Sequence, residues 1–175
     1  QTFHIEYEPP ELSEGDIYKL DVQQAYRDAY QVLRGFGTDY QRLKDRGWSS
    51  SACIDTGVGC VPSWDEFAKR MKNRGYTKEY MKEVDITPRI FNEDTIVFTW
   101  RNAHGDPIGF SARNTKYDHN SPNNAKRWVN TGSKCPIFRK KQEMFGFSWA
   151  KAHNPIYIVE GHGSVVAAYG HGIHN

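Results

Sequence analysis

The residues best suited to chemistry in this 175-residue chain are a carboxylate after a short apolar run and a basic stretch upstream of it. Glu160 directly follows Ile156-Tyr-Ile-Val159, a run typical of a strand buried on both faces. Open α/β sheets place their sites at the carboxyl ends of such strands, so Glu160 is a candidate site residue. On the residues alone, a structural surface role for Glu160 remains open.

The basic stretch covers residues 113–141 and carries eight Lys and Arg side chains against the single acid Asp118. Aromatic residues are interleaved with them. Cations neutralise phosphates and rings stack on bases, so this composition indicates nucleotide or nucleic-acid binding. A solvated face on an ordinary domain is the alternative. The basic residues are Arg113, Lys116, Lys126, Arg127, Lys134, Arg139, Lys140 and Lys141, and the aromatic ones are Tyr117, Trp128 and Phe138.

Other motifs exclude several kinds of site. The glycines at 161 and 163 suggest a dinucleotide-binding loop, but Val166 stands where the third glycine belongs. Three histidines crowd the end of the sequence, at His162, His171 and His174. Their spacing does not make them converge on a metal, so we expect them at the surface or in a disordered end. The three cysteines form no Cys-x-x-Cys pair, so we expect no zinc site, a reducing compartment, and cysteines that serve as small core residues.

Composition narrows the class of protein further. Hydrophobic residues make up 38% and charged residues 25%, with a mean hydropathy of −0.77. This is typical of one globular domain or two small subdomains. No window approaches the roughly 18 apolar residues of a membrane span, and no charged-then-apolar leader opens the sequence. We therefore expect no membrane association.

The predicted elements position these residues in order. Residues 1–16 predict an extended lead-in, and apolar residues at three- and four-residue steps predict a helix over 17–33. Ser63 and Glu66 match a capping box at the start of another helix. The remaining expectations are short helices over 40–45 and 77–84, a strand or turn over 56–62, a hairpin of 95–101 with 107–112, an ordered loop over 114–134, a helix near 141–150, a buried strand over 156–159, and a helix over 165–169.

From Tyr40 onward, the chain resembles the DnaG-type bacterial and phage primases, in the amino-terminal part of their RNA-polymerase domain. Six segments match that family's motifs in order. They are YQRLKDRGW (40–48), GVGCVPSWDEF (57–67), TIVFTWRNAHGDPIGFSAR (95–113), KYDHNSP (116–122, with one residue inserted), PIFRKKQEMFGF (136–147) and IYIVEGHGSVVAAYGHGI (156–173). The last segment is similar to the first motif of the toprim fold.

The resemblance implies a mixed α/β fold: a basic α+β subdomain followed by the first βα unit of a toprim, Rossmann-like sheet. It divides the chain into a lead-in and helix (1–37), the basic amino-terminal subdomain (38–154) and an incomplete toprim start (155–175). The implied activity is synthesis of short RNA primers on single-stranded DNA from ribonucleoside triphosphates. A replicative helicase partner and the cytoplasm of a bacterial or phage-infected cell are also implied.

The resemblance also assigns roles. Arg46, Arg113, Lys116 and Lys140 match positions that bind nucleotide phosphates or template. The further candidates for a basic groove are Lys126, Arg127, Lys134, Arg139 and Lys141. Glu160 matches the catalytic glutamate that works with Mg²⁺ or Mn²⁺, whose ions clamp the attacking and leaving oxygens of phosphoryl transfer.

Three departures qualify these roles. Ser164 stands where the family usually has an acid, and the later Asp-x-Asp metal motif and the zinc ribbon are not in this sequence. One carboxylate rarely positions Mg²⁺. We therefore expect the chain alone to make no primers, with the remaining ligands supplied by a second polypeptide or a missing C-terminal part. The alternative is a non-catalytic module or accessory subunit that binds single-stranded nucleic acid. Another toprim protein, such as a topoisomerase or nuclease, is disfavoured by residues 95–140.

Overall fold

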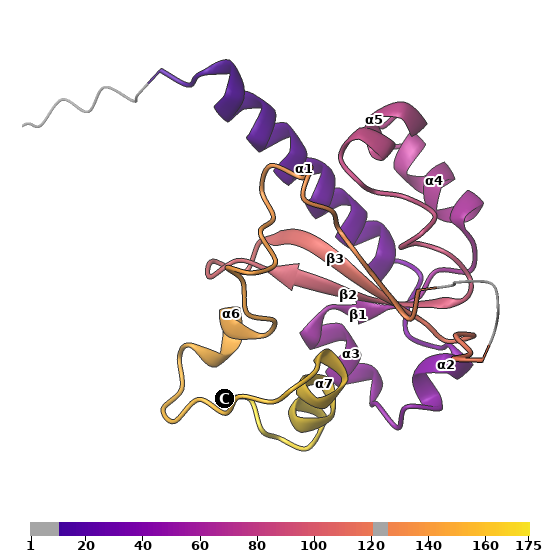
Figure 1. Cartoon of the computed structure of the whole chain (residues 1–175), viewed down its shortest axis with the longest axis vertical. Coiled ribbons are helices and arrows are strands. Elements are labelled where there is room, and N and C mark those ends of the chain that lie inside the picture. Colours follow the sequence, from indigo (N-terminus) through magenta and orange to yellow (C-terminus); the bar gives the residue numbers. More distant parts are fainter. Residues whose placement is uncertain (1–10, 121–125) are drawn as a thin grey trace, which may run out of the picture.

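The centre of the protein is a four-stranded antiparallel sheet with strand order β1-β2-β3-β4. A computed structural model describes residues 11–120 and 126–175 (Figure 1). The strands are β1 (Val58–Gly59), β2 (Thr95–Arg101), β3 (Pro107–Asn114) and β4 (Trp128–Asn130). With its helices, this sheet confirms the predicted mixed α/β class. Residues 1–10 of the predicted lead-in, and Ser121 and Pro122 of the fourth primase-like segment, lie outside the described residues.

Strands β2 and β3 form the predicted hairpin, closed by residues 102–106. The Asn102 side-chain oxygen accepts hydrogen bonds from the backbone N–H groups of His104 (2.9 Å) and Asp106 (3.0 Å). Gly105 has φ +93°, a left-handed conformation that glycine adopts without strain. Pairing runs from Thr95 opposite Asn114 to Arg101 opposite Pro107, with a shift after Trp100. This turn therefore fixes which side chains face each side of the sheet.

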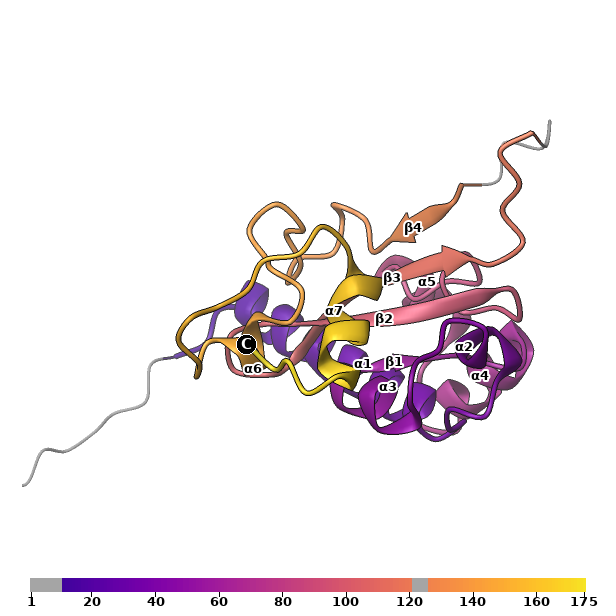
Figure 2. The same cartoon turned by 90° about the horizontal axis from the view of Figure 1, so that it is seen from below.

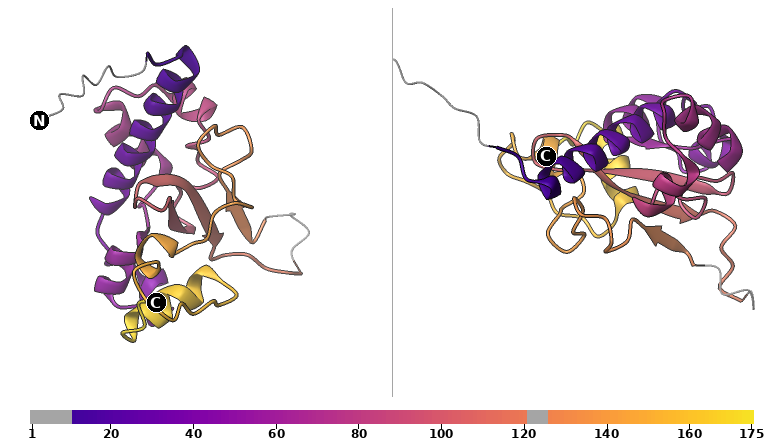
Figure 3. Two further views of the ribbon diagram at one scale, coloured as in Figure 1. Left: turned by 90° about the vertical axis from the view of Figure 1, so that its left-hand side faces the viewer. Right: turned by 90° about the horizontal axis from the view of Figure 1, so that it is seen from above.

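The helices cover both faces of the sheet. They are α1 (Glu14–Arg34), α2 (Gln41–Lys44), α3 (Ser50–Thr56), α4 (Trp64–Lys72), α5 (Lys78–Glu83), α6 (Phe147–Ala150) and α7 (His162–Gly170). Helix α1 crosses one face and α7 lies against the other, with α3 packed beside α7 (Figures 2 and 3). Within the described ranges, no helix has the length and apolar character to cross a bilayer.

Local sequence explains where the main helices begin. The Ser13 hydroxyl caps α1 by accepting a hydrogen bond from the Asp16 N–H (3.2 Å), so the helix begins three residues before the predicted start. In the same way, the Ser63 hydroxyl accepts from the Glu66 N–H (3.2 Å), which confirms the predicted start of α4. The predicted helices over 40–45 and 77–84 are also present, as α2 and α5.

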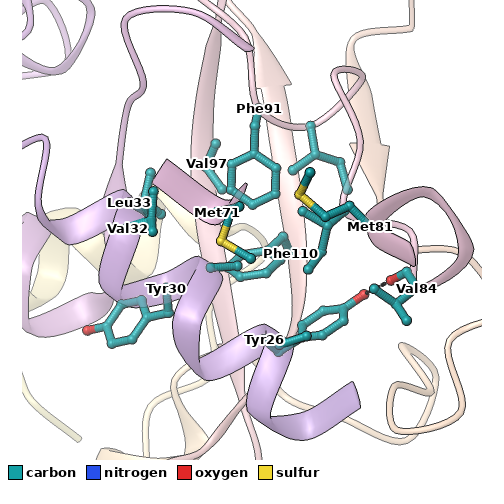
Figure 4. Close-up of a cluster of buried hydrophobic side chains, with 14 of the residues drawn as sticks. Tyr26, Tyr30, Val32, Leu33, Met71, Met81, Val84, Phe91, Val97 and Phe110 are labelled. Atoms are coloured by element: carbon teal, nitrogen blue, oxygen red, sulfur yellow. Dashed lines mark hydrogen bonds between the residues drawn. The ribbon is translucent and has the colours of Figure 1, made fainter. Parts of the chain in front are cut away.

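The core between α1 and the sheet combines stacked aromatic rings with aliphatic and methionine side chains (Figure 4). Tyr26 stacks on Phe110 with ring centroids 5.3 Å apart, and Phe91 meets Phe110 edge-on at 5.0 Å. The Tyr26 hydroxyl donates to the backbone oxygen of Val84 (2.7 Å), so its polar end is satisfied inside the core. These contacts hold α1 and the loop after α5 against β3.

Four expectations differ from the structure. Strand β4 lies within the predicted loop, and α3 was not predicted. The predicted helix over 141–150 is confined to α6. Residues 156–159 are not a strand, because no described strand pairs with them, and the Ile158 side chain is 79% exposed. A run of this kind is buried only where neighbouring strands cover it. The predicted helix that follows is present as α7.

A cavity in the aromatic core should lower stability strongly. We expect Phe110→Ala to reduce the free energy of unfolding by about 3–5 kcal/mol, because Phe110 is fully buried and contacts two other rings. Urea unfolding followed by far-UV circular dichroism measures this difference. Ile158→Ala is the control and should change stability little. Equal losses of unfolding free energy in the two variants would contradict the described core.

The cysteines should be inert towards thiol reagents in the native state. All three are free and buried, and burial raises the pKa of the Cys53 and Cys60 thiols to about 11. At pH 8 about one such thiol in a thousand is ionised, and the thiolate is the reactive form. We expect Ellman's reagent to modify all three cysteines at once only after unfolding. Rapid modification of any cysteine in the native protein would contradict their burial.

Candidate nucleic-acid interface

One face of the sheet gathers aromatic, polar and cationic side chains. Alternate residues of a strand point to the same face, so Phe98 and Trp100 of β2 share a face with Ser111 and Arg113 of β3. Strand β4 extends this face, because Trp128 pairs with Arg113 and Asn130 pairs with Ser111. We call this surface the outer face, since α1 covers the opposite one.

Three arginines lie close together at one end of the outer face. Burial and the nearby positive charges of Arg46 and Arg127 lower the pKa of Arg113. The Arg113 guanidinium also lies over the ring of Trp128, 5.7 Å from its centroid. Within the described ranges, the ion pairs involve other cations: Lys19, Arg27, Lys44, Arg74, Arg89 and Lys116. Arg46 and Arg127 therefore each repel Arg113, and an anion would relieve that repulsion.

A groove of about 840 Å³ lies along β4 beside this arginine cluster. Lys126, Lys140 and Trp128 line its β4 side, and the opposite wall carries both signs of charge, from Arg89, Glu93 and Asp94. Its volume is within the range of small-molecule sites. Cations beside an aromatic ring are suited to a phosphate and its attached base.

A chain of hydrogen bonds holds Lys140 in place across the sheet. The Trp100 indole N–H donates to the Ser111 hydroxyl (2.7 Å), and that hydroxyl donates to the Asn130 side-chain oxygen (2.6 Å). The same oxygen accepts from the Lys140 ammonium group (3.1 Å). Lys140 is exposed, so this chain positions its charge at the wall of the groove without burying it.

The remaining predicted cations are placed differently. Lys116 forms an ion pair with Asp94 (2.7 Å), and Arg139 donates to the backbone oxygen of Cys135 (2.9 Å) in its own loop. Lys141 lines a separate hollow of about 360 Å³. Lys134 is exposed. The structure therefore brings together Arg46, Arg113 and Arg127, and places Lys126 and Lys140 in the adjoining groove.

Glu160 is exposed and lies just before α7, whose N-cap is Gly161. His162, which we expected at the surface, instead lies among four aromatic rings. Burial, and then the charge of Lys140, lower the pKa of His162 to about 4, so its imidazole is neutral at physiological pH. Among residues 11–120 and 126–175, no three His, Cys, Asp or Glu side chains cluster to hold a metal ion.

Sequence reasoning missed two residues that shape this surface. Asn130 bridges Ser111 and Lys140, yet an asparagine in a polar stretch carries no distinctive signal. Asp85 has φ +63°, uncommon outside glycine, and its carboxylate accepts a hydrogen bond from the Gly132 N–H. Asp85 thereby fixes the loop that follows β4. Neither role was visible before β4 was known to exist.

Comparison with known proteins places this arrangement in a family. The profile for the N-terminal domain of the DNA primase catalytic core matches residues 34–151, about two thirds of the chain. The chain belongs to this family. The predicted resemblance to DnaG-type primases is thereby confirmed.

Individual relatives agree with the assignment. The DNA primase of Lactococcus lactis is 29% identical over 143 residues, which cover 76% of this chain and 22% of that protein. The Pseudomonas putida DNA primase is 27% identical over 186 residues, covering 95% and 26%. This member of the primase family therefore spans about a quarter of the length of these curated relatives.

Solved primase structures share the fold. The Aquifex aeolicus primase, with its zinc-binding and RNA polymerase domains, has a TM-score of 0.71 at 21% identity, covering 94% of this chain and 43% of that one. The RNA polymerase domain of Mycobacterium tuberculosis primase DnaG, in complex with a double-stranded DNA oligomer with a 6-nucleotide overhang, has a TM-score of 0.67 at 24% identity, covering 87% and 52%.

Repulsion within the arginine cluster should lower stability at low salt. We expect Arg127→Gln to raise the Tm by about 1–2 °C in dilute buffer, and the gain to vanish near 1 M salt, where charges are screened over a few ångströms. Differential scanning calorimetry at both salt concentrations measures this. Lys134→Gln removes an equal charge outside the cluster and is the control. A similar gain from the control would show that net charge, not proximity, is responsible.

Proposed function

We propose that this chain is the template- and nucleotide-binding part of a DNA primase, which makes short RNA primers on single-stranded DNA during replication. The main support for this proposal is the cluster of Arg46, Arg113 and Arg127 beside Trp128 on the outer face. Phosphates of the template or of a ribonucleoside triphosphate relieve the repulsion among the arginines, and Trp128 supplies a ring on which a base can stack.

Lys140 and Lys126 extend the proposed binding surface into the groove. The Trp100–Ser111–Asn130 chain holds the Lys140 ammonium ready for a phosphate, which limits the entropy lost on binding. Lys116 would join the surface only by giving up Asp94, and Arg139 only by leaving its own loop. Lys134 and Lys141 contribute longer-range attraction. Published DnaG structures bound to single-stranded DNA and to double-stranded DNA with an overhang support binding of this polymer class.

We further propose that residues 38–154 form the basic subdomain and that residues 155–175 begin a toprim sheet. The family match over 34–151 supports this division. In this scheme Glu160 is a catalytic carboxylate that holds Mg²⁺ or Mn²⁺, and the metal neutralises charge during nucleotidyl transfer. The described residues do not form a complete metal site. In this scheme further carboxylates come from outside this chain, and a replicative helicase is a partner of the whole enzyme.

Binding to single-stranded DNA tests the proposed surface. We expect the chain to bind a fluorescent oligonucleotide, and Arg113→Ala and Lys140→Ala each to weaken binding about fivefold at 0.1 M salt while reducing the salt slope by about 0.7. Fluorescence anisotropy across a salt series measures both quantities. Lys72→Ala on α4, outside the groove, is the control. Unchanged affinity in both test variants would refute the proposed interface.

Primer synthesis separates the proposal from a non-catalytic binding module. We expect the purified chain, given single-stranded DNA, ribonucleoside triphosphates and Mg²⁺, to yield no RNA product, because it supplies only one of the proposed metal-binding carboxylates. Addition of a polypeptide bearing the Asp-x-Asp motif of a relative should restore synthesis, in a manner that depends on Glu160. DNA binding without restoration would favour the accessory module, and synthesis by the chain alone would overturn the incomplete site.

A further inference from the structure

The side chain of His162 fills an aromatic cage on the outer face. Its ring centroid lies 4.9 Å from that of Phe145, 5.1 Å from those of Trp100 and Trp128, and 5.3 Å from that of Phe98. The walls come from β2, β4 and the loop before α6, which are far apart in the sequence. An imidazole in contact with four aromatic rings is held more firmly than a single surface contact would allow.

Trp100 belongs both to the aromatic cage and to the hydrogen-bond chain that positions Lys140. Its ring faces His162 and packs against Phe138 at 5.4 Å, while its indole N–H begins the hydrogen-bond chain that ends at Lys140. Trp100 is 5% exposed, so its position is fixed by packing on all sides. The same indole therefore bears on the positions of Lys140 and His162.

Helix α7 also packs against a second region, which comprises α3 and the loop between α2 and α3. Val166 is fully buried, and a Cβ atom added at Gly163 would lie 3.1 Å from the Trp48 ring. A Cβ atom added at Gly170 would lie 3.4 Å from that of Ala52. The small residues let the helix approach closely, but this seat lies on the far side of His162 from Glu160.

The segment before α7 offers little to hold Glu160. Residues 151–160 are all exposed and contain no strand, and α6 ends at Ala150. The Lys151 ammonium group donates to the Ala103 backbone oxygen, and the Asn175 amide donates to that of Pro155 (2.7 Å), so the segment is held at these two points. Residues 156–160, which follow, are exposed and less restrained. His162, two residues beyond Glu160, is the nearest side chain enclosed by the sheet.

We propose that His162 is a positioning residue, whose docking in the aromatic cage sets the place of Glu160 relative to Lys140 and Arg113. The docking is supported by the ring contacts of His162, and the importance of Glu160 rests on the proposed function. The cage requires a flat ring of moderate size, so phenylalanine should replace histidine here and alanine should not.

A spin label at Glu160→Cys measures this positioning directly, because the three native cysteines are buried. The chain is prepared with fluorotryptophan and labelled with a nitroxide, and the ¹⁹F signals of Trp100 and Trp128 are compared with that of Trp64 on α4. We expect the label to broaden Trp100 and Trp128 more than Trp64. Adding His162→Ala should abolish that preference, whereas adding His162→Phe should preserve it.

Hydrogen exchange of the unlabelled chain provides a second measurement. We expect His162→Ala to speed exchange in α7 by at least tenfold while exchange in α1 stays unchanged, which also shows that the core remains folded. His162→Phe should exchange like the parent. His171→Ala, which removes an exposed histidine at the end of α7, is the control and should also match the parent.

Either of two results overturns the proposal: preserved broadening in His162→Ala, or a phenylalanine variant that behaves like the alanine variant. These outcomes are independent of DNA binding. If Arg113→Ala and Lys140→Ala leave oligonucleotide affinity unchanged, the proposed function fails while the docking of His162 can still hold.

Discussion

The register between β2 and β3 is the constraint on which the rest of this structure depends. Phe98 lies opposite Ser111, and Ile96 lies opposite Arg113. Because side chains alternate between faces, this register sends Phe110 towards α1 and Arg113 to the outer face. A slip of one residue in β3 would turn Arg113 into the aromatic core and Phe110 towards the groove. The turn at Asn102 and Gly105, which closes the hairpin, thus determines where the cations stand.

The two faces of the sheet contribute differently to the stability of the protein. The face towards α1 buries Tyr26, Phe91 and Phe110 in close aromatic contact, and this burial supplies stability. The outer face carries arginines that repel one another, and the Arg113 Nε is buried without a hydrogen-bond partner among the described residues. An unpaired buried donor costs stability until a ligand accepts from it. A well-packed first face lets the sheet tolerate that cost on the second.

Much of the fold could be predicted from local sequence, because the signals were local. Ser63 begins α4 as the predicted cap, and β-branched and aromatic residues on both sides of the turn at 102–106 form β2 and β3. The cap at Ser13 was missed, because residues 1–16 were expected to be extended. Strand β4 is only three residues long within a polar stretch, so no periodicity revealed it. The apolar run over 156–159 predicted a buried strand wrongly, since its composition cannot show whether neighbouring strands are present to cover it.

The candidate site was less predictable, because its residues meet only through the tertiary fold. Arg46 and Arg113 were both expected to bind phosphates, but their proximity depends on α2 lying beside the end of β3. Lys116 and Arg127 looked alike in sequence, yet one pairs with Asp94 and the other joins the arginine cluster. A count of charges along the chain cannot distinguish a paired cation from an unpaired one.

The aromatic cage around His162 shows how the tertiary fold can position a site that is built from two parts of the chain. Arg113 stands on the sheet and Lys140 is hydrogen-bonded to Asn130 of β4, whereas Glu160 follows nine exposed residues, 151–159, that pair with no described strand. Lys151 and Pro155 are tied to Ala103 and Asn175, but residues 156–160 are exposed, and ordering them at each encounter with substrate would cost entropy. In our proposal, docking His162 on Trp100 and Trp128 reduces that freedom beforehand. The sheet, and not the linker, then sets the geometry between carboxylate and cations.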